Sequence, residues 1–176
     1  MEKRKMFQNG AFCVFFLLAY GNCAYRTNLP VTLYLIRHAE RPSGVDSLDE
    51  VGMKRAADLA EVLKYADIQA IYTSDTRRAQ QTAQPLVRML QVPVRKYEAS
   101  DKNAVLKQIK EHNQGDKILV VGHSNTLPFI LCGLNVTRDT SWLPHDQYDD
   151  LFQVLIYKNG TNQLNHLKYG AVSKRK

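Results

Sequence analysis

The sequence predicts an α/β protein in which helices cover both faces of a mostly parallel central sheet, as a three-layer α/β/α sandwich. Short apolar runs at 33–36, 70–72 and 117–121 have the composition of strands that are buried on both faces. Between these runs lie longer segments whose apolar residues recur at helical spacing. Strands that alternate with helices form parallel sheets, because each helix carries the chain back across the sheet.

The two helices expected before residue 91 have recognisable start signals. Ser47 and Glu50 have the spacing of a capping box ahead of a helix from about 48 to 65. A second helix opens at Arg78 and contains Pro85, which should kink it because proline lacks a backbone donor.

The second half of the chain continues the alternation and ends in a hairpin. Pro128 suits the first turn of the last expected helix, and Lys158-Asn159-Gly160 suits a hairpin turn. The remaining expected elements are a strand at 92–97, a helix at about 103–112, a helix from 127, and strands at 151–157 and 163–168.

The first 24 residues have the three parts of a secretory signal. Basic residues at 3–5 precede an apolar run at 11–20, and small residues follow. The run is shorter than the ~20 residues that a membrane-spanning helix needs. We therefore expect residues 1–24 to be a signal peptide, residues 25–176 to form one domain, and the protein to be exported to a bacterial periplasm or envelope.

Two alternatives remain for the N-terminal segment. Cys23 could be the acylated cysteine of a lipoprotein signal, although residues 20–22 fit a lipobox poorly. A buried N-terminal helix is the other alternative. Contact with a membrane is thus expected only through the signal or a lipid anchor. Cys132 lies in an apolar segment and is expected to be a small buried residue, without a disulfide framework.

The strand at 33–36 stops abruptly at a cluster of cationic and imidazole side chains. Arg37 and His38 follow it directly, and Arg41 lies three residues further on. A neutral imidazole between two guanidiniums resists protonation and stays a nucleophile, while guanidinium forks match the oxygens of a phosphoryl group. Taken alone, the pattern fits a solvated basic patch equally well.

Similar side chains follow the next two buried runs. Arg78 lies in the first turn of a helix, where backbone amides favour an anion, and His123-Ser124 follow the strand at 117–121. The carboxyl ends of parallel strands meet at one edge of a sheet, which is where α/β proteins place their sites. A lone histidine after a strand is usually structural, but the three clusters together favour a functional site. Arg77 is expected to be a solvated cation at the helix start.

The stretches 37–41, 74–79 and 120–124 resemble, in order and spacing, the motifs of the histidine phosphatase superfamily, branch 1, the phosphoglycerate-mutase-like group. The resemblance covers roughly residues 32–157. It implies a phosphoglycerate-mutase-like fold and a phosphohistidine intermediate on His38, with neither metal nor cofactor. It also implies a phosphate site made of Arg37, Arg41, Arg78, His123 and Ser124, with His123 catalytic as well.

A leaving-group acid is expected in the loop that follows the strand at 92–97. Glu98 and Asp101 are the two candidates. Asp101 also fits a helix N-cap, and Glu98 also fits a surface position at a strand end. A phosphohistidine phosphatase needs no dedicated acid, because protonated phosphoramidates leave readily.

The family resemblance favours hydrolysis over mutase activity, because mutases carry long insertions between positions 97 and 123. The expected substrate is a small or envelope-associated phosphomonoester. Phosphohistidine protein phosphatase and a catalytically silent phosphate- or polyanion-binding protein are the alternatives. A metal site using His38 and His123 lacks carboxylate or thiolate partners at suitable spacing. Nucleic acid is not expected, because the basic tail at 173–176 has no aromatic stacking platform.

Overall fold

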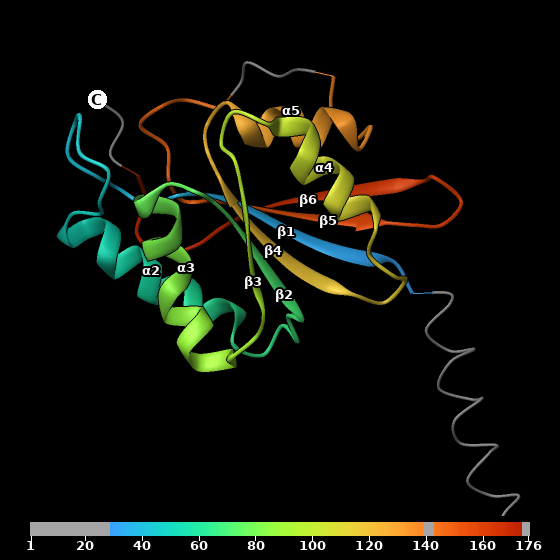
Figure 1. The fold of residues 1–176 in the computed structure, drawn as a ribbon, viewed down its shortest axis with the longest axis horizontal. Coiled ribbons are helices and arrows are strands. Elements are labelled where there is room, and N and C mark those ends of the chain that lie inside the picture. The colour runs from blue at the N-terminus through green and yellow to red at the C-terminus, as the bar shows by residue number, and fades with distance from the viewer. Residues whose placement is uncertain (1–28, 139–142, 174–176) are drawn as a thin grey trace, which may run out of the picture.

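The computed structural model describes residues 29–138 and 143–173, which form a six-stranded sheet with helices on both faces (Figure 1). The strand order is β3-β2-β4-β1-β5-β6, in which β1 to β4 are parallel and β5 and β6 are antiparallel to their neighbours. The predicted α/β class with a mostly parallel sheet is confirmed. The strands are β1 (Val31–Arg37), β2 (Ala70–Ser74), β3 (Val94–Tyr97), β4 (Lys117–Gly122), β5 (Asp150–Ile156) and β6 (Asn162–Lys168).

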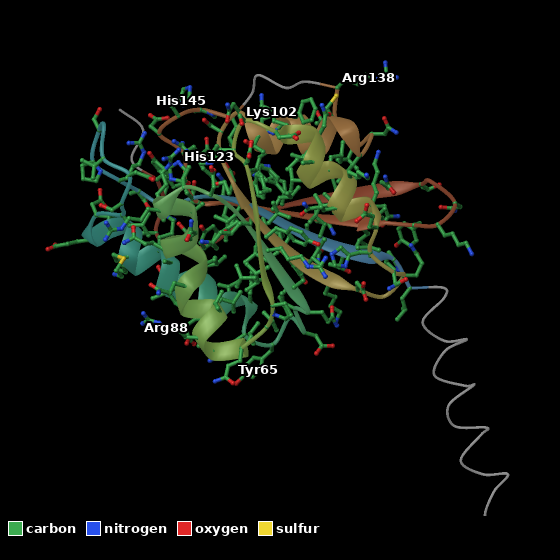
Figure 2. All side chains as sticks on the ribbon, in the orientation of Figure 1. Tyr65, Arg88, Lys102, His123, Arg138 and His145 are labelled. Carbon is green, nitrogen blue, oxygen red and sulfur yellow. The ribbon has the colours of Figure 1, made fainter. Side chains whose placement is uncertain are left out.

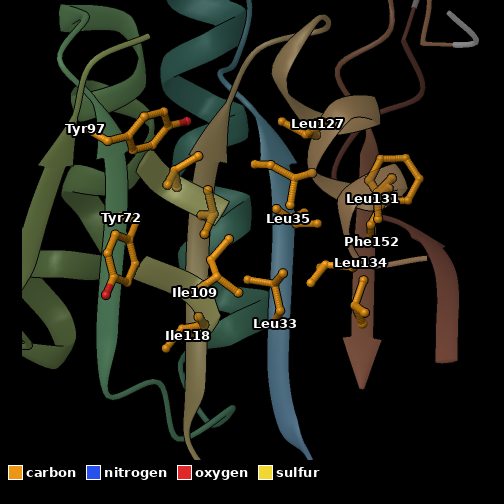
Figure 3. Close-up of a cluster of buried hydrophobic side chains, with 14 of the residues drawn as sticks. Leu33, Leu35, Tyr72, Tyr97, Ile109, Ile118, Leu127, Leu131, Leu134 and Phe152 are labelled. Atoms are coloured by element: carbon orange, nitrogen blue, oxygen red, sulfur yellow. The ribbon is translucent and has the colours of Figure 1, made fainter. Parts of the chain in front are cut away.

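Two pairs of helices enclose the sheet. Helices α2 (Glu50–Leu63) and α3 (Arg77–Leu90) cover one face, and α4 (Lys102–Lys110) and α5 (Thr126–Gly133) cover the other (Figure 1). Each face has its own apolar cluster, and Figure 3 shows the one beneath α4 and α5. The central strands β1 and β4 are buried on both faces, which explains their unbroken apolar runs.

The start of α2 differs from the expected capping box. Asp49, not Ser47, is the N-cap, because its carboxylate accepts from the backbone N–H of Gly52 at 2.8 Å. The backbone N–H of Leu48 donates to the side chain of Gln81 on α3, which holds this residue outside the helix. A tertiary contact therefore moves the helix start by two residues. Helix α3 runs on through Pro85 to Leu90.

Helix α2 packs directly against the loop that follows β1. A Cβ atom at Gly52 would lie 2.2 Å from the backbone oxygen of Glu40, so only glycine allows this approach. The Glu40 carboxylate also pairs with buried Arg55, whose Nε and Nη2 donate to it at 2.6 to 2.9 Å. The loop after His38 is therefore fixed to the helical layer.

The predicted signal peptide at residues 1–24 and the alternatives that involve Cys23 lie outside the described residues. Within 29–138 and 143–173, no helix is long and apolar enough to cross a membrane. Cys132 is half-buried on α5 with a free thiol.

Candidate active site

The order of the strands brings the sequence clusters together at one edge of the sheet. Arg37 ends β1 opposite Gly122 of β4, and the backbone N–H of His38 donates to the Gly122 oxygen at 2.9 Å. This register places the rings of His38 and His123 5.2 Å apart between centroids, in an edge-on arrangement. Figure 2 shows His123 close to His145, at the end of the molecule away from Tyr65.

The ring of His38 is buried, and only its Nδ1 has a hydrogen-bond partner within residues 29–138 and 143–173. Its Nδ1 lies 2.8 Å from the backbone oxygen of Ala39, so Nδ1 carries the proton and Nε2 keeps its lone pair. Burial, followed by repulsion from Arg37, His123 and Arg78, lowers the pKa of His38 to about 3, although the bond to Ala39 works the other way. The imidazole is therefore neutral at ordinary pH, and Nε2 is available as a nucleophile.

The second histidine is neutral for similar reasons but has both ring nitrogens engaged. Arg78 Nη2 donates to Nδ1 of His123 at 3.3 Å, so the ring proton lies on Nε2, which donates to Ser74 Oγ at 2.8 Å. Burial, then the charges of Arg78 and Arg37, lower the pKa of His123 to about 4. His123 thus links β4, β2 and α3 beside the nucleophile.

Arg37 is nearly fully buried, and its guanidinium donates to backbone oxygens of the loop at 144–147. Its Nη1 donates to the backbone oxygens of Pro144, His145 and Gln147, and its Nη2 lies 3.4 Å from the hydroxyl of Tyr148. The guanidinium also lies 4.1 Å from the centroid of the Tyr148 ring. Burial lowers the pKa of Arg37, and nearby Arg41 and Arg78 add to the effect.

Arg78 forms hydrogen bonds with both His123 and the carboxylate of Asp46, and the sequence did not predict the contact with Asp46. Asp46 accepts from Arg78 Nη1 at 2.7 Å and from the backbone N–H groups of Arg77 and Arg78 at 2.9 and 3.3 Å. Partial burial raises the pKa of Asp46, but these hydrogen bonds outweigh it and hold that pKa below its ordinary value. The amides at the start of α3, expected to be open to an anion, are therefore already occupied by Asp46.

Two guanidinium donors at the site have no acceptor. The Nε atoms of Arg37 and Arg78 are buried and lack a hydrogen-bond partner within the described part of the chain. A buried N–H without an acceptor is costly, so such groups are expected to face a ligand that supplies one. The surplus of positive charge indicates that the ligand is an anion.

The other predicted phosphate-binding residues lie at the rim. Arg41 is half-buried and donates to the backbone oxygens of Pro42 and Val45 in its own loop. The hydroxyl of Ser124 lies 3.1 Å from Nδ1 of His145. The structure thus gathers Arg37, His38, Arg78 and His123 and leaves Arg41 and Ser124 at the border.

The two candidate acids lie further away. Glu98 is exposed just after β3, which is separated from β1 by β2 and β4, so its strand end is roughly 14 Å from that of β1 at the usual spacing. Asp101 caps α4 by accepting from the backbone N–H of Ala104 at 2.9 Å, which confirms the N-cap interpretation. A role as leaving-group acid stays a prediction for both residues.

Sequence reasoning did not assign roles to several residues that shape the site. Thr82 on α3 accepts from the backbone N–H of Ala39 at 2.9 Å and so fixes the residue after the nucleophile. Ser74 belongs to the motif that contains Arg78, and this spacing could have pointed to it. Asp46 carries no such signal, because only the folded chain brings it to Arg78.

Metal ligands are not grouped at this site. Across residues 29–138 and 143–173, no three His, Cys, Asp or Glu side chains are arranged to hold a metal ion. The cations next to His38 are the guanidiniums themselves.

Comparison with known proteins gives the same family as the motifs. The family model of the histidine phosphatase superfamily, branch 1, matches residues 33–99, which contain His38 and Arg78. No curated protein sequence matches the chain.

Solved structures extend the likeness to most of the fold. A phosphoglycerate mutase from Plasmodium falciparum has 21% identity and a TM-score of 0.60, covering 85% of this chain and 96% of its own. An Agrobacterium tumefaciens protein described as the phosphohistidine phosphatase SixA has 19% identity and a TM-score of 0.53, and the match covers 81% of this chain and 99% of the Agrobacterium protein. A mycobacterial glucosyl-3-phosphoglycerate phosphatase has 16% identity and a TM-score of 0.61, covering 77% and 97%.

Identities this low show the fold alone. The fold and site define an α/β protein with a histidine pair in an arginine-rich pocket. Residues 33–99 match the model of the histidine phosphatase superfamily, branch 1, and the structural neighbours of the fold include phosphatases and a mutase.

Proposed function

We propose that this protein hydrolyses a phosphomonoester through a phosphohistidine intermediate on His38. The observation that carries the proposal is the pair of buried Nε–H donors, on Arg37 and Arg78, that flank a neutral histidine with a free Nε2. An in-line attack on a phosphoryl group requires a neutral nucleophile and cationic donors that are free to bind the phosphoryl oxygens.

In the first step, Nε2 of His38 attacks phosphorus, the bond from phosphorus to the ester oxygen breaks, and the leaving alcohol takes up a proton. Arg37 and Arg78 stabilise the charge on the equatorial oxygens in the transition state, and each donor of this kind contributes roughly 3 kcal/mol. In the second step, water attacks the phosphohistidine and releases phosphate, which returns His38 to its neutral form.

His123 has a role tied to the charge of the substrate. Its pKa is low in this structure because burial and Arg78 disfavour the imidazolium. A bound phosphate dianion opposes that effect and favours protonation of Nδ1, which then donates to a phosphoryl oxygen. Arg78 Nη2, displaced from Nδ1, turns to the same anion.

Hydrolysis is the proposed outcome rather than transfer of phosphate within one substrate. Phosphatases and a mutase share this fold, so the fold alone does not separate the two. The mutase neighbour is covered over 96% of its length by 85% of this chain, so the short segment between Tyr97 and His123 does not separate the two activities either, and product analysis must decide between them. With a signal peptide at residues 1–24, the substrate is an envelope-associated or other exported phosphomonoester, and the protein is periplasmic. The leaving-group proton comes from water, unless the loop after β3 brings Glu98 or Asp101 within hydrogen-bond reach in the substrate complex.

The test is turnover of phenyl phosphate by the protein and by His38→Ala, each with and without a chelator. Chelator-resistant turnover that is lost in the variant, with labelled phosphate trapped on the unaltered protein, is the expected result. Phosphate binding without turnover of any tested ester would instead favour the silent binder of phosphate or polyanions. Turnover that survives in His38→Ala would overturn the assigned nucleophile.

A further inference from the structure

A pocket of about 530 Å³ adjoins the candidate active site, and no step described above uses it. It shares Arg41, His145 and Tyr148 with the rim of the site. The Tyr148 ring lies against the Arg37 guanidinium and 6.1 Å from the His38 ring, between centroids. The pocket therefore begins one side chain away from the nucleophile. Its volume lies within the range of roughly 300–1,000 Å³ that small-molecule sites have.

One wall of this pocket comes from the end of the described chain. Ala171 and Val172 line it. The Ser173 hydroxyl fixes them by accepting from the backbone N–H of Tyr148 at 2.8 Å and lying 2.9 Å from a carboxylate oxygen of Asp149. Gly170 has a φ of +64°, which lets the chain turn back toward α2. These bonds tie the segment 171–173 to the loop at 148–149.

The opposite wall comes from the β1 loop and the start of α2. Val51 lines the pocket here and is 57% exposed at its mouth. With the ring of Tyr148 and the side chains of Ala171 and Val172, it gives the pocket a partly apolar surface. An exposed valine on this wall is free to contact an apolar face of a ligand.

The charges of the pocket disfavour an ionic ligand. Glu40 and Arg55 neutralise each other, and the Asp49 carboxylate caps α2. Apart from that pair, the lining holds the carboxylates of Asp49 and Asp146 and the guanidinium of Arg41, beside the imidazole of His145, so it presents charges of both signs. An anionic group would meet the carboxylates and a cationic group the guanidiniums. Hydroxyl groups suit both kinds of side chain, because they donate to carboxylates and accept from guanidiniums.

We propose that this pocket binds the leaving group of the substrate, and that this group is an uncharged polyhydroxyl compound of sugar size with one apolar face. The inference rests on the proposed phosphatase function, since the phosphoryl group must lie at His38 for its ester oxygen to point toward Tyr148. Val51 and the 171–173 segment then select the leaving group without contacting the phosphoryl group.

The experiment compares Val51→Trp, which fills the mouth of the pocket, with the matched control Val62→Trp. Both valines are exposed on α2, at 57% and 52%, and only Val51 lines the pocket. A hexose 6-phosphate is the substrate, and inorganic phosphate is an inhibitor that needs only the phosphoryl site. We expect Val51→Trp to raise the KM for the hexose phosphate about tenfold, a difference of about 1.4 kcal/mol. The inhibition constant of Val51→Trp for phosphate should stay within twofold of that of the unaltered protein. For Val62→Trp, both the KM for the hexose phosphate and the inhibition constant for phosphate should stay within twofold.

A second comparison uses the unaltered protein and three esters whose leaving groups differ in charge. The hexose 6-phosphate should give a higher kcat/KM than 3-phosphoglycerate, with its carboxylate, or phosphocholine, with its quaternary ammonium. Preference for either charged ester, or an equal KM in the two tryptophan variants, overturns the inference while leaving the phosphatase proposal intact. Absence of turnover on every ester, phenyl phosphate included, overturns the phosphatase proposal itself and the inference with it.

Discussion

The two ends of the central strands both hold histidine and arginine, but only one end has unbalanced charge. At the carboxyl end, His38 and His123 lie among Arg37 and Arg78, and two buried guanidinium N–H groups lack acceptors within the described residues. Burial and the arginines keep both imidazoles neutral. This end of the sheet is therefore built to receive an anion.

At the amino end, the same residue types form a connected network. His112 Nδ1 lies 3.0 Å from a carboxylate oxygen of Asp116, and its Nε2 lies 2.8 Å from the hydroxyl of Tyr72. Arg95 Nη1 donates to the same hydroxyl at 2.9 Å. Each ring nitrogen of His112 has a protein partner, and a carboxylate balances the cationic groups. The comparison teaches that the function of these residue types depends on which partners the fold leaves out.

The largest expected effect separates the two ends by activity. His38→Ala removes the nucleophile and should lower turnover of phenyl phosphate by roughly 10³-fold or more. His112→Ala should leave turnover within twofold and lower the free energy of unfolding by about 1–2 kcal/mol, because the buried Tyr72 hydroxyl loses a partner. Steady-state kinetics and urea unfolding of both variants check this. Equal losses of activity would contradict the distinction between the two ends.

The sequence predicted well which residues meet at the carboxyl end of the sheet, because each motif lies where a buried strand stops. His38, Arg37 and His123 could be placed at one edge from strand order in the chain alone, since parallel strands align their carboxyl ends. Asp46 could not be placed, because it contacts Arg78 through a loop whose path depends on tertiary packing. The expected cap at Ser47 failed for the same reason.

The next effect tests the geometry of the arginines rather than their charge. Arg37→Lys and Arg78→Lys each keep a cation but lose the Nε–H donor, so each should lower kcat/KM by roughly 10²-fold. Arg95→Lys at the amino end is the matched control and should change kcat/KM by less than twofold. Full activity of both lysine variants at the active end would show that only net charge matters there.

A smaller effect concerns stability at acidic pH. The folded protein lowers the pKa of His38 to about 3 and that of His123 to about 4, whereas unfolded histidine titrates near 6.5. Between these values the unfolded state binds more protons, so the free energy of unfolding falls as pH drops, by up to about 1.4 kcal/mol per pH unit for each histidine. Urea unfolding from pH 7 to 4 should give a shallower slope for His38→Ala than for His112→Ala. Identical slopes would contradict a neutral buried His38.

The smallest effect concerns the carboxylate that shares Arg78 with the substrate. Asp46 accepts from Arg78 and from the amides at the start of α3. Asp46→Asn keeps an acceptor for the amides but releases the guanidinium, so phosphate should inhibit about two- to threefold more tightly. We also expect kcat to fall severalfold, because a released Arg78 loses the orientation that the transition state requires.

The control for this change is Asp67→Asn, which alters an exposed carboxylate paired with Lys117 far from Arg78. If the affinity for inhibitory phosphate and kcat both rose, or both fell, in Asp46→Asn, Asp46 would act through its charge alone. The pKa of Asp46 lies below the ordinary aspartate value, so its bonds persist above that pKa and are lost only as pH falls through it. The unaltered protein and Asp46→Asn should therefore differ in phosphate inhibition and kcat as much at pH 5 as at pH 7. An equal difference at both pH values means that Asp46 acts by orienting Arg78 and not by titrating near neutrality.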